Sequence, residues 1–288
     1  MKLLENPEAM RNLSENWRSE GLVVGLVPTM GALHEGHLSL IRRARAACDR
    51  VVVSIFVNPT QFGRGEDFET YSRPFERDSA LLREEGCDVI FAPTVETMYG
   101  GSSLDLSPSG ERVYVEAGGL GEIWEGEARP GHMRGVATVV TMLLNIARPH
   151  RAYFGEKDYQ QLKVIERLVR NLFFGIEIVP CPTVREPDGL AMSSRNVNLS
   201  PEERRAATVL QRALSAAANL KQQGESSVAD LVAAMREVYD TEPLVSVQYA
   251  AVVNADTLAP LNSLEGGPAR AIIAARVGET RLIDNIKL

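Results

Sequence analysis

Uniformly apolar runs, separated by turns and amphipathic segments, recur through the first two thirds of the chain. Five of these runs predict β-strands, at residues 22–27, 51–57, 88–92, 151–154 and 176–179. Because they lack the apolar–polar alternation of a half-exposed strand, we expect parallel strands covered on both faces. Segments that suit helices precede or separate them, at residues 7–20, 38–47, 71–85, 133–147 and 155–173. The alternation predicts an α/β fold with a doubly wound, Rossmann-like parallel sheet.

The last third of the chain has a different pattern. Pro180 and Pro187 mark a change in composition, at which we place a domain boundary. Beyond it we expect two helices and three strands, at residues 201–223, 228–239, 245–253, 271–275 and 280–286. The sequence therefore predicts a larger Rossmann-like domain at 1–186 and a smaller α+β domain at 187–288.

Residues 93–131 interrupt the periodic pattern. They are rich in glycine, serine and proline, and only residues 113–115 suit a short strand. Long loops within compact domains often act as lids over a functional site, so we expect this segment to be a lid or an irregular excursion.

The stretch Pro28–His37 joins the first predicted strand to the helix that follows. Its glycines, Gly31 and Gly36, allow positive φ and close backbone approach. Backbone N–H groups and a helix N-terminus at the carboxyl end of a strand suit a polyphosphate. His34 and His37 stand three residues apart, where they share one side of the first helical turn. The stretch is typical of a nucleotide-binding loop.

Two other interpretations of this stretch stay open on the residues alone. An ordinary loop between a strand and a helix, with two polar surface histidines, has the same local features. A zinc site is less favoured, because zinc metalloprotease helices place their histidines four residues apart, whereas here the spacing is three.

The overall composition is that of an ordinary globular protein. Of its 288 residues, 44% are hydrophobic and 24% are charged, and the formal net charge is −7. This charge argues against nucleic acid or an anionic membrane as a partner. Cys48, Cys87 and Cys181 form no pair with metal or redox spacing, so we expect buried thiols in a reducing cytoplasm. No run of residues is long and apolar enough to suggest a secretory or membrane-spanning segment.

Three later loops repeat the polar character of the histidine stretch. They are residues 58–63, 155–161 and 184–195, and in a doubly wound sheet such loops can converge on one crevice. Lys157 and Arg195 would supply local cations for phosphates. Taken alone, the third loop is better explained as an interdomain linker with a solvated arginine.

These residues together resemble a known family. Pro28–His37 resembles the His-x-Gly-His signature of the nucleotidyltransferase-like superfamily of ATP-using enzymes, and its longer form is similar to the pantoate–β-alanine ligase family, the pantothenate synthetases. Phe56–Phe62, Gly155–Gln161 and Ala191–Asn196 are similar to three further motifs of that family and follow in the same order. The resemblance is close from residue 22 to about residue 205.

The resemblance implies site residues. It implies catalytic roles for His37, His34 and Lys157, with His37 as proton donor and Lys157 on the phosphates. The implied ATP site consists of Met30, Gly31, Ala32, Leu33, His34, Glu35, Gly36, His37, Gly155, Glu156, Lys157, Asp158, Val184, Met192, Ser193, Ser194 and Arg195. Gln61, Gln161 and Asn58 are the implied residues for pantoate and β-alanine. Asp78 is a candidate ligand of Mg²⁺, with a helix-surface acid as its alternative.

The implied reaction is an ATP-dependent ligation through a pantoyl adenylate, which yields pantothenate, AMP and pyrophosphate. The implied partners are pantoate, β-alanine, ATP with Mg²⁺, and a second copy of the chain in a homodimer. A nucleotidyltransferase of the same superfamily acting on another small substrate is the alternative enzyme. A non-catalytic nucleotide sensor is the alternative outside enzymes, although it gives no reason for Gln61 and Gln161.

Overall fold

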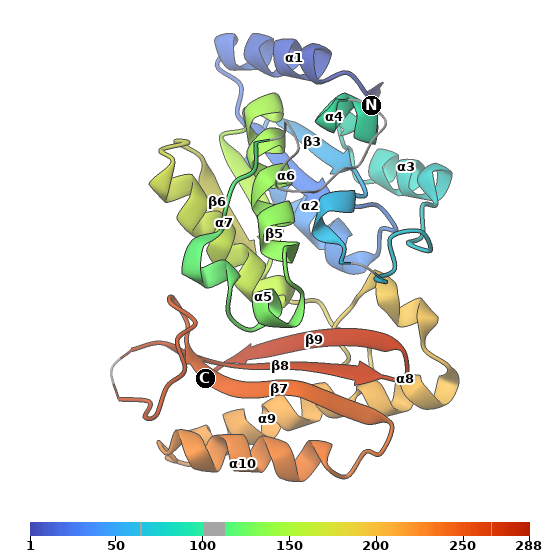
Figure 1. The fold of residues 1–288 in the computed structure, drawn as a ribbon. Coiled ribbons are helices and arrows are strands. Elements are labelled where there is room, and N and C mark those ends of the chain that lie inside the picture. Colours follow the sequence, from blue (N-terminus) through green and yellow to red (C-terminus); the bar gives the residue numbers. More distant parts are fainter. Residues whose placement is uncertain (64, 101–112, 266) are drawn as a thin grey trace. The chain divides into compact units, whose positions relative to one another are not determined.

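The computed structural model describes residues 1–63, 65–100, 113–265 and 267–288. The chain forms two compact units, drawn in Figure 1. The first unit comprises Met1–Glu156 and Val164–Cys181, and the second comprises Lys157–Lys163 and Pro182–Leu288.

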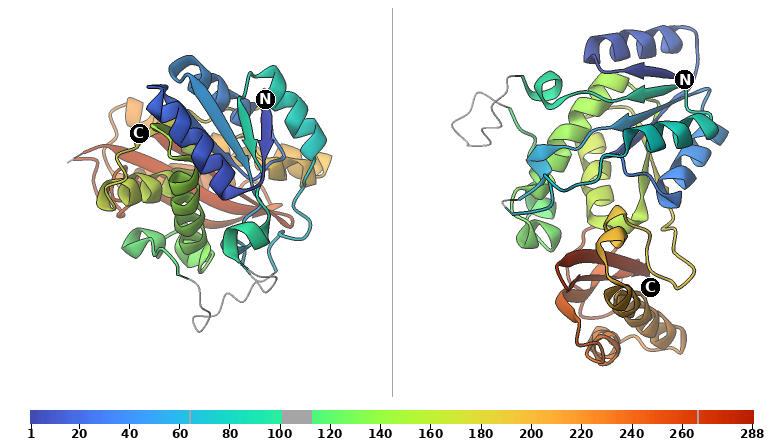
Figure 2. Two further views of the ribbon diagram at one scale, coloured as in Figure 1. Left: turned by 90° about the horizontal axis from the view of Figure 1, so that it is seen from above. Right: turned by 90° about the vertical axis from the view of Figure 1, so that its right-hand side faces the viewer.

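The first unit is built on a six-stranded parallel sheet in the order β1-β4-β3-β2-β5-β6. Its strands are β1 (Lys2–Leu4), β2 (Val24–Thr29), β3 (Arg50–Ile55), β4 (Val89–Phe91), β5 (Arg151–Gly155) and β6 (Glu177–Cys181). Figure 2 shows helices on both faces of this sheet. The helices and 3₁₀ turns along this part of the chain are α1 (Pro7–Ser19), α2 (Glu35–Ala47), η1 (Pro59–Gln61), α3 (Phe75–Glu84), α4 (Val95–Tyr99), η2 (Gly118–Gly121), α5 (Glu125–Ala128), α6 (His132–Ala147), η3 (Glu156–Asp158) and α7 (Tyr159–Asn171).

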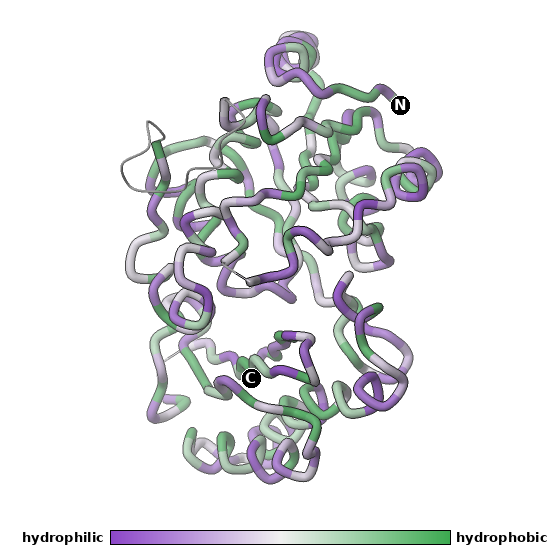
Figure 3. Tube along the Cα trace, turned by 45° about the vertical axis from the view of Figure 1, so that its right-hand side comes forward, coloured by the Kyte–Doolittle hydropathy of each residue, from purple (hydrophilic) through white to green (hydrophobic). Residues whose placement is uncertain are grey.

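The apolar runs form the core of the first unit, which is why they are uniformly apolar. Val27, Val51 and Val53 are buried together with Ile41 of α2 and Leu82 of α3. The surface helices carry hydrophobic residues toward the core and polar residues toward solvent, and α1 in Figure 3 shows both classes along one helix. The predicted doubly wound parallel sheet is confirmed.

The second unit pairs an antiparallel sheet with helices. Strands β7 (Val245–Asn254), β8 (Ala269–Val277) and β9 (Thr280–Lys287) form a three-stranded sheet in chain order. Its remaining elements are η4 (Ser194–Asn198), α8 (Pro201–Ala207), α9 (Val209–Gln222) and α10 (Val228–Tyr239). Buried alanine and branched residues of β8 pack against α9 and α10, which gives this unit its own hydrophobic core.

Several element boundaries differ from the prediction. β1 has three residues and is held by pairing with β4, which its short sequence does not reveal. Residues 113–115 form no strand; instead, the N–H of Val115 donates to Thr138 Oγ1 at 3.0 Å. The predicted helix 201–223 is broken at Thr208, whose hydroxyl donates to the carbonyl of Arg205 at 2.8 Å. Residues 101–112 of the expected lid lie outside the described residues.

The division into units also differs from the predicted boundary at residue 186. The second unit begins at Pro182 and takes Lys157–Lys163 as well. Side chains explain this, because Tyr159 donates through its hydroxyl to the carbonyl of Ala255 at 2.8 Å and stacks under the Arg270 guanidinium at 3.7 Å.

The three cysteines are buried and free, as expected. Burial raises the pKa of the Cys87 thiol to about 12 and that of Cys181 to about 11, so both stay protonated at neutral pH. Across the described ranges, we find no helix that combines the length and the apolar character needed to cross a bilayer.

Candidate active site

The histidine loop lies at the point of the first unit's sheet where the strand order reverses. β2 is flanked by β3 on one side and by β5 on the other, so successive connections from β2 and β5 run in opposite directions. Ligands of doubly wound sheets bind outside the carboxyl ends of strands at such a reversal. The loop that follows β2 and Gly155 at the end of β5 both occupy this position.

The loop between β2 and α2 has a fixed and unusual backbone. Gly31 has φ 80° and Ala32 has φ 51°, which places a non-glycine residue in the left-handed region. Thr29 anchors the entrance, because its hydroxyl donates to the carbonyl of Ser54 at 2.6 Å and accepts from the N–H of Gly31 at 3.2 Å. The positive φ of Ala32 costs free energy that surrounding contacts must offset.

Asp78 of α3 supplies those contacts. Its carboxylate accepts the N–H of Ala32 at 2.7 Å through one oxygen and the N–H of Leu33 at 2.9 Å through the other, and the side chain is 1% exposed. Burial raises the pKa of Asp78, while the two N–H donors act in the opposite direction. Asp78 therefore supports the backbone of the histidine loop, and its role as a Mg²⁺ ligand stays a prediction.

The two histidines of the loop begin helix α2. His34 is its N-cap, and its Nδ1 accepts the N–H of Gly36 at 3.1 Å. Nδ1 of His37 accepts the N–H of His34 at 3.4 Å, and the two ring centroids lie 4.1 Å apart. When neutral, each imidazole therefore carries its proton on Nε2. The helix starts at Glu35, three residues earlier than predicted, because the histidines cap it.

Gln61 sits in η1, the turn that follows β3, and its amide is oriented by a chain of hydrogen bonds. Asn58 Nδ2 donates to the carbonyl of Gly135 at 3.1 Å and to Gln61 Oε1 at 3.1 Å. Since a carbonyl can only accept, this contact fixes which end of the Asn58 amide is the donor. Gln61 Nε2 is then directed toward Met30 Sδ, at 2.9 Å, in the histidine loop.

Asn58 is buried, and its polar atoms are engaged within the protein. The side chain is 1% exposed, and its Oδ1 also accepts from the hydroxyl of Tyr99 at 2.7 Å. These contacts suit Asn58 to orienting Gln61, and its contact with a substrate stays a prediction. Gly135 makes the arrangement possible, because a Cβ there would lie 2.3 Å from the carbonyl oxygen of Thr60.

A charged network holds Gln61 from its backbone side. His132 Nδ1 lies 2.7 Å from the carbonyl oxygen of Gln61, so it carries the proton and donates, while its Nε2 lies 3.0 Å from the Arg129 guanidinium. Burial and the Arg129 charge lower the pKa of His132 to about 4. Arg129 also forms a two-pronged ion pair with Glu66, at 2.6 and 2.7 Å. Burial opposes ionisation of Glu66, but the Arg129 hydrogen bonds and charge outweigh it and lower the pKa to about 2.

The second unit carries the remaining predicted site residues, except Gly155 and Glu156, which belong to the first unit. Lys157 and Asp158 lie in η3, with Lys157 Nζ 3.6 Å from Asp158 Oδ1, and Gln161 follows in the first turn of α7. Val184 and Met192 are joined by a backbone hydrogen bond of 3.0 Å, which closes a hairpin-like loop. Ser193 then caps η4, where its hydroxyl accepts the N–H of Arg195 at 3.3 Å.

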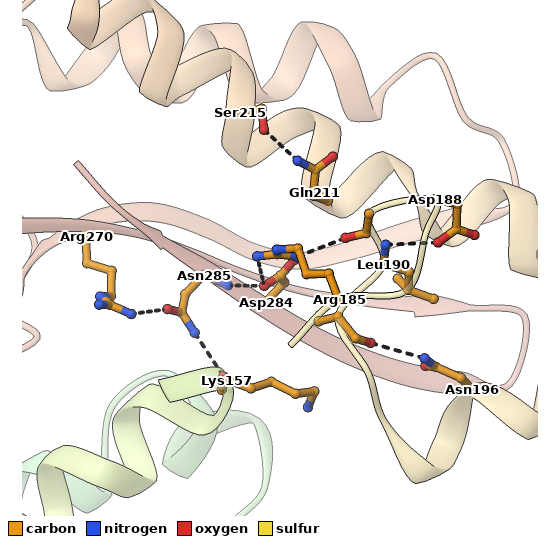
Figure 4. Close-up of polar contacts among 12 residues, drawn as sticks. Lys157, Arg185, Asp188, Leu190, Asn196, Gln211, Ser215, Arg270, Asp284 and Asn285 are labelled. Atoms are coloured by element: carbon orange, nitrogen blue, oxygen red, sulfur yellow. Dashed lines mark hydrogen bonds and ion pairs between the residues drawn. The ribbon is translucent and has the colours of Figure 1, made fainter. Parts of the chain in front are cut away.

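Strand β9 supports both of these segments, as Figure 4 shows. Arg185 forms a two-pronged ion pair with Asp284, at 2.6 and 3.0 Å, and donates to the carbonyl of Gly189 at 3.1 Å. Asn285 Nδ2 donates to the carbonyl of Lys157 at 2.9 Å. Asp284 and Asn285 are not among the residues predicted from the sequence, although two adjacent polar residues within the apolar run 282–286 were a signal that could have found them.

The structure thus gathers the predicted residues in two groups. In the first unit, the histidine loop and Gln61 meet through Met30, while Leu33 is fully buried and offers only its backbone. In the second unit, Lys157 and the 184–195 loop share the support of β9. Among the described residues, no three histidine, cysteine, aspartate or glutamate side chains gather as a metal centre.

Comparison with known proteins decides the family. The family model described as pantoate-beta-alanine ligase matches residues 2–287. The chain is 68% identical over 286 residues to pantothenate synthetase of Rubrobacter xylanophilus, which covers 99% of this chain and 98% of the relative. The chain belongs to the pantoate–β-alanine ligase family.

Solved structures of the family agree with the fold. The crystal structure of pantothenate synthetase from Thermus thermophilus has a TM-score of 0.91 and 49% identity, and covers 100% of this chain and 99% of that chain. Pantoate-beta-alanine ligase from Francisella tularensis, complexed with beta-gamma ATP and beta-alanine, has a TM-score of 0.78 and 35% identity. The match covers 100% of this chain and 97% of that chain. The family and the ligase class that the four motifs predicted are confirmed.

Proposed function

We propose that this chain joins pantoate to β-alanine at the expense of ATP, and that the site residues act as assigned below. The observation that carries this proposal is the histidine loop, fixed by Asp78 at the reversal of the sheet and touching the oriented amide of Gln61. Family membership and the Francisella relative's complex with β-γ ATP and β-alanine support the choice of substrates.

In the first step, a carboxylate oxygen of pantoate forms a bond to the α-phosphorus of ATP. The bond from that phosphorus to the bridging oxygen breaks, and pyrophosphate leaves with the electron pair. We assign the Nε2–H groups of His34 and His37 to the oxygens on which charge develops, since both Nδ1 atoms accept from the backbone. His37 is the proposed proton donor.

The triphosphate is assigned to cations and backbone N–H groups. Lys157 is a compact charge for phosphate, and Arg195 and the hydroxyls of Ser193 and Ser194 complete the set on the second unit. Backbone groups from Met30 to His37, and from Gly155 to Asp158, with Val184 and Met192, are assigned to the nucleotide. Support for these assignments comes from the motif match and from the helix start at Glu35.

Pantoate is assigned to the two glutamines. Gln61 offers its Nε2 hydrogens because its Oε1 is taken by Asn58, so it suits the pantoate carboxylate or hydroxyls as a donor. Gln161 is the proposed second donor. Neutral amides orient a carboxylate without quenching its nucleophilicity as a tight cation would. Asn58, His132 and Arg129 are proposed to position Gln61.

In the second step, the uncharged amine of β-alanine attacks the acyl carbon of the pantoyl adenylate. The bond from that carbon to the phosphate oxygen breaks, AMP leaves, and the new amide nitrogen loses a proton. Shelter from water is needed here because the mixed anhydride would otherwise hydrolyse. We propose that the ordered loops around Gln61 contribute to this shelter.

Mg²⁺ is proposed to enter as part of the ATP substrate, on its phosphates. The ion keeps several waters in such sites and needs few protein ligands. This arrangement suits a protein whose candidate ligand, Asp78, has both oxygens engaged by backbone N–H groups.

We further propose a cytoplasmic homodimer, as the family resemblance implies. The exposed side chains of Leu172 and Phe173, 53% and 91% accessible at the end of α7, give such an association an apolar surface. Light scattering on purified protein tests this part, since a mass of one chain at all concentrations would reject it.

The function itself is tested by following pyrophosphate release from ATP with pantoate alone, in parallel with other small acids. We expect release only with pantoate, and we expect pantothenate and AMP once β-alanine is added. Absence of pantoate-dependent release would overturn the proposal. Release with a different acid, or transfer of AMP to a phosphate or alcohol, would favour the related nucleotidyltransferase function.

A further inference from the structure

Two adjacent polar residues, Asp284 and Asn285, interrupt the apolar sequence of strand β9 in the second unit. Both are buried, at 2% and 5% exposure. Successive side chains of a strand point to opposite faces, so these neighbours reach two different partners. One partner is the backbone of Lys157 and the other is Arg185, as Figure 4 shows.

Asn285 holds the Lys157 peptide with a defined orientation. Its Oδ1 accepts from the guanidinium of Arg270, which can only donate, so Nδ2 is the end that faces the carbonyl of Lys157, at 2.9 Å. Arg270 is itself fixed by stacking on the ring of Tyr159, at 3.7 Å. The backbone from which the Lys157 side chain projects is therefore tied to β8 and β9.

Asp284 holds the loop that leads to the Ser193 turn. Its two oxygens pair with the two terminal nitrogens of Arg185, and one of them also accepts the N–H of Asn285 at 2.7 Å. Arg185 lies opposite Ala191 in a β-bridge and donates to the carbonyl of Gly189. The ion pair thus fixes both arms of the loop just before Ser193.

We propose that Asp284 and Asn285 are positioning residues for ATP. Together they set the spacing between Lys157 and the Ser193–Arg195 turn. The inference rests on the proposed function, in which these two segments bind the triphosphate. Neither residue needs to touch ATP, because small displacements of binding groups are enough to weaken binding and catalysis.

Two substitutions of Asn285 isolate the contact with Lys157. Asn285→Asp keeps the acceptor for Arg270 but loses the donor, and Asn285→Leu loses both without adding charge. We expect each variant to weaken binding of a non-hydrolysable ATP analogue, measured by calorimetry, by about tenfold. The KM for pantoate should change by less than about twofold. Gln248→Ala is the matched control, because it removes a polar partner of Arg281 within the same sheet and should leave both constants unchanged.

The ion pair is tested by a double-mutant cycle, since Asp284→Asn alone leaves a charged Arg185 without its partner and can fail to fold. Asp284→Asn combined with Arg185→Gln replaces the ion pair by a neutral hydrogen-bonded pair. We expect the double variant to bind the ATP analogue better than either single variant that folds. Failure of this rescue in a folded double variant would overturn the role of the ion pair.

The overall inference is overturned if both Asn285 variants bind the analogue as the wild type does. It is equally overturned if their affinities for the analogue and for pantoate fall together in proportion to a lower melting temperature, which indicates a merely structural role. These outcomes are distinct from failure of the proposed function, in which the wild-type chain itself shows no pantoate-dependent pyrophosphate release.

Discussion

The two units hold their site segments by different means. In the first unit, the carboxylate of Asp78 accepts two backbone N–H groups and a chain of amides orients Gln61. In the second unit, two neighbouring residues of one strand hold two segments: Asp284 forms an ion pair with Arg185, and Asn285 donates to the carbonyl of Lys157. The first arrangement fixes backbone conformation at one loop, whereas the second sets the distance between two segments.

This contrast makes different substitutions informative in each unit. Damage to the first unit should reduce the rate of chemistry or the use of pantoate, because the histidines and Gln61 lie there. Damage to the contacts of β9 in the second unit should mainly weaken ATP binding, because Asp284 and Asn285 hold the segments that carry Ser193 and Lys157. The four predictions that follow concern the first unit and run from the largest expected effect to the smallest.

His37→Ala should lower kcat for pantothenate formation by about 10²- to 10⁴-fold, because the variant lacks the proposed proton donor. His150→Ala is the matched control, since His150 Nδ1 likewise accepts a backbone N–H, from Val24 at 3.0 Å, but lies at the opposite end of the sheet. The control should lose some stability and keep its kcat. Nearly normal turnover by a folded His37→Ala enzyme would reject the role of His37.

Gly135→Ala should destabilise the protein by about 3 kcal/mol and raise the KM for pantoate, because the added Cβ forces η1 away from α6. The ideal Cβ lies 2.3 Å from the carbonyl oxygen of Thr60 and 2.6 Å from the nitrogen of Gln61. Urea unfolding and steady-state kinetics measure the two effects. Gly119→Ala, at which a Cβ meets no atom within 4 Å, should change neither. An unaltered KM in Gly135→Ala would show that the position of η1 does not govern pantoate use.

Asp78→Asn should reduce the free energy of unfolding by about 2 kcal/mol, since an amide offers one acceptor where the backbone presents two donors. The kcat should fall as well, because the loop that carries His34 loses its support. Asp88→Asn is the control: Asp88 also accepts a backbone N–H, from Val51 at 2.8 Å, but it lies just before β4, at the amino-terminal edge of the sheet. Equal losses of kcat in both variants would mean that the loss of stability, not the histidine loop, is responsible.

The smallest expected effect is a dependence of stability on pH, which arises from the titration of His132. Its pKa is lowered from 6.5 to about 4 in the folded protein, so the unfolded chain binds a proton more readily between these values. Stability is therefore retained above pH 6.5 and lost as the pH falls toward 4. Between about pH 6.5 and pH 5, we expect the wild type to lose about 1–2 kcal/mol more than His132→Asn, which keeps a donor to Gln61 but does not titrate. Identical pH profiles would contradict this assignment.

The sequence predicted those features that depend on local pattern. The apolar runs gave the parallel sheet, because a strand buried on both faces needs apolar residues at every position. The histidine loop was recognisable because its glycines and polar residues are contiguous. β1 was not predicted, because three residues are too few to show a hydrophobic pattern and its pairing partner β4 lies far along the chain.

The supporting residues could not be predicted in the same way, because they act across long separations. Asp78 lies 45 and 46 residues from the N–H groups that it accepts, and its position on α3 resembles an ordinary helix-surface acid. Asp284 and Asn285 lie 99 and 128 residues from their partners. Their roles follow from the packing of elements that no periodicity specifies.

The central claim, that the histidine loop and the triphosphate-binding segments adenylate pantoate, is tested most directly by isotope exchange. Labelled pyrophosphate is incubated with the wild-type protein, unlabelled ATP, Mg²⁺ and pantoate, and the label in ATP is followed over time. We predict that label enters ATP only when pantoate is present and that β-alanine is not required. Exchange that is absent with pantoate, or that appears only after β-alanine is added, would contradict an adenylate formed before the amide.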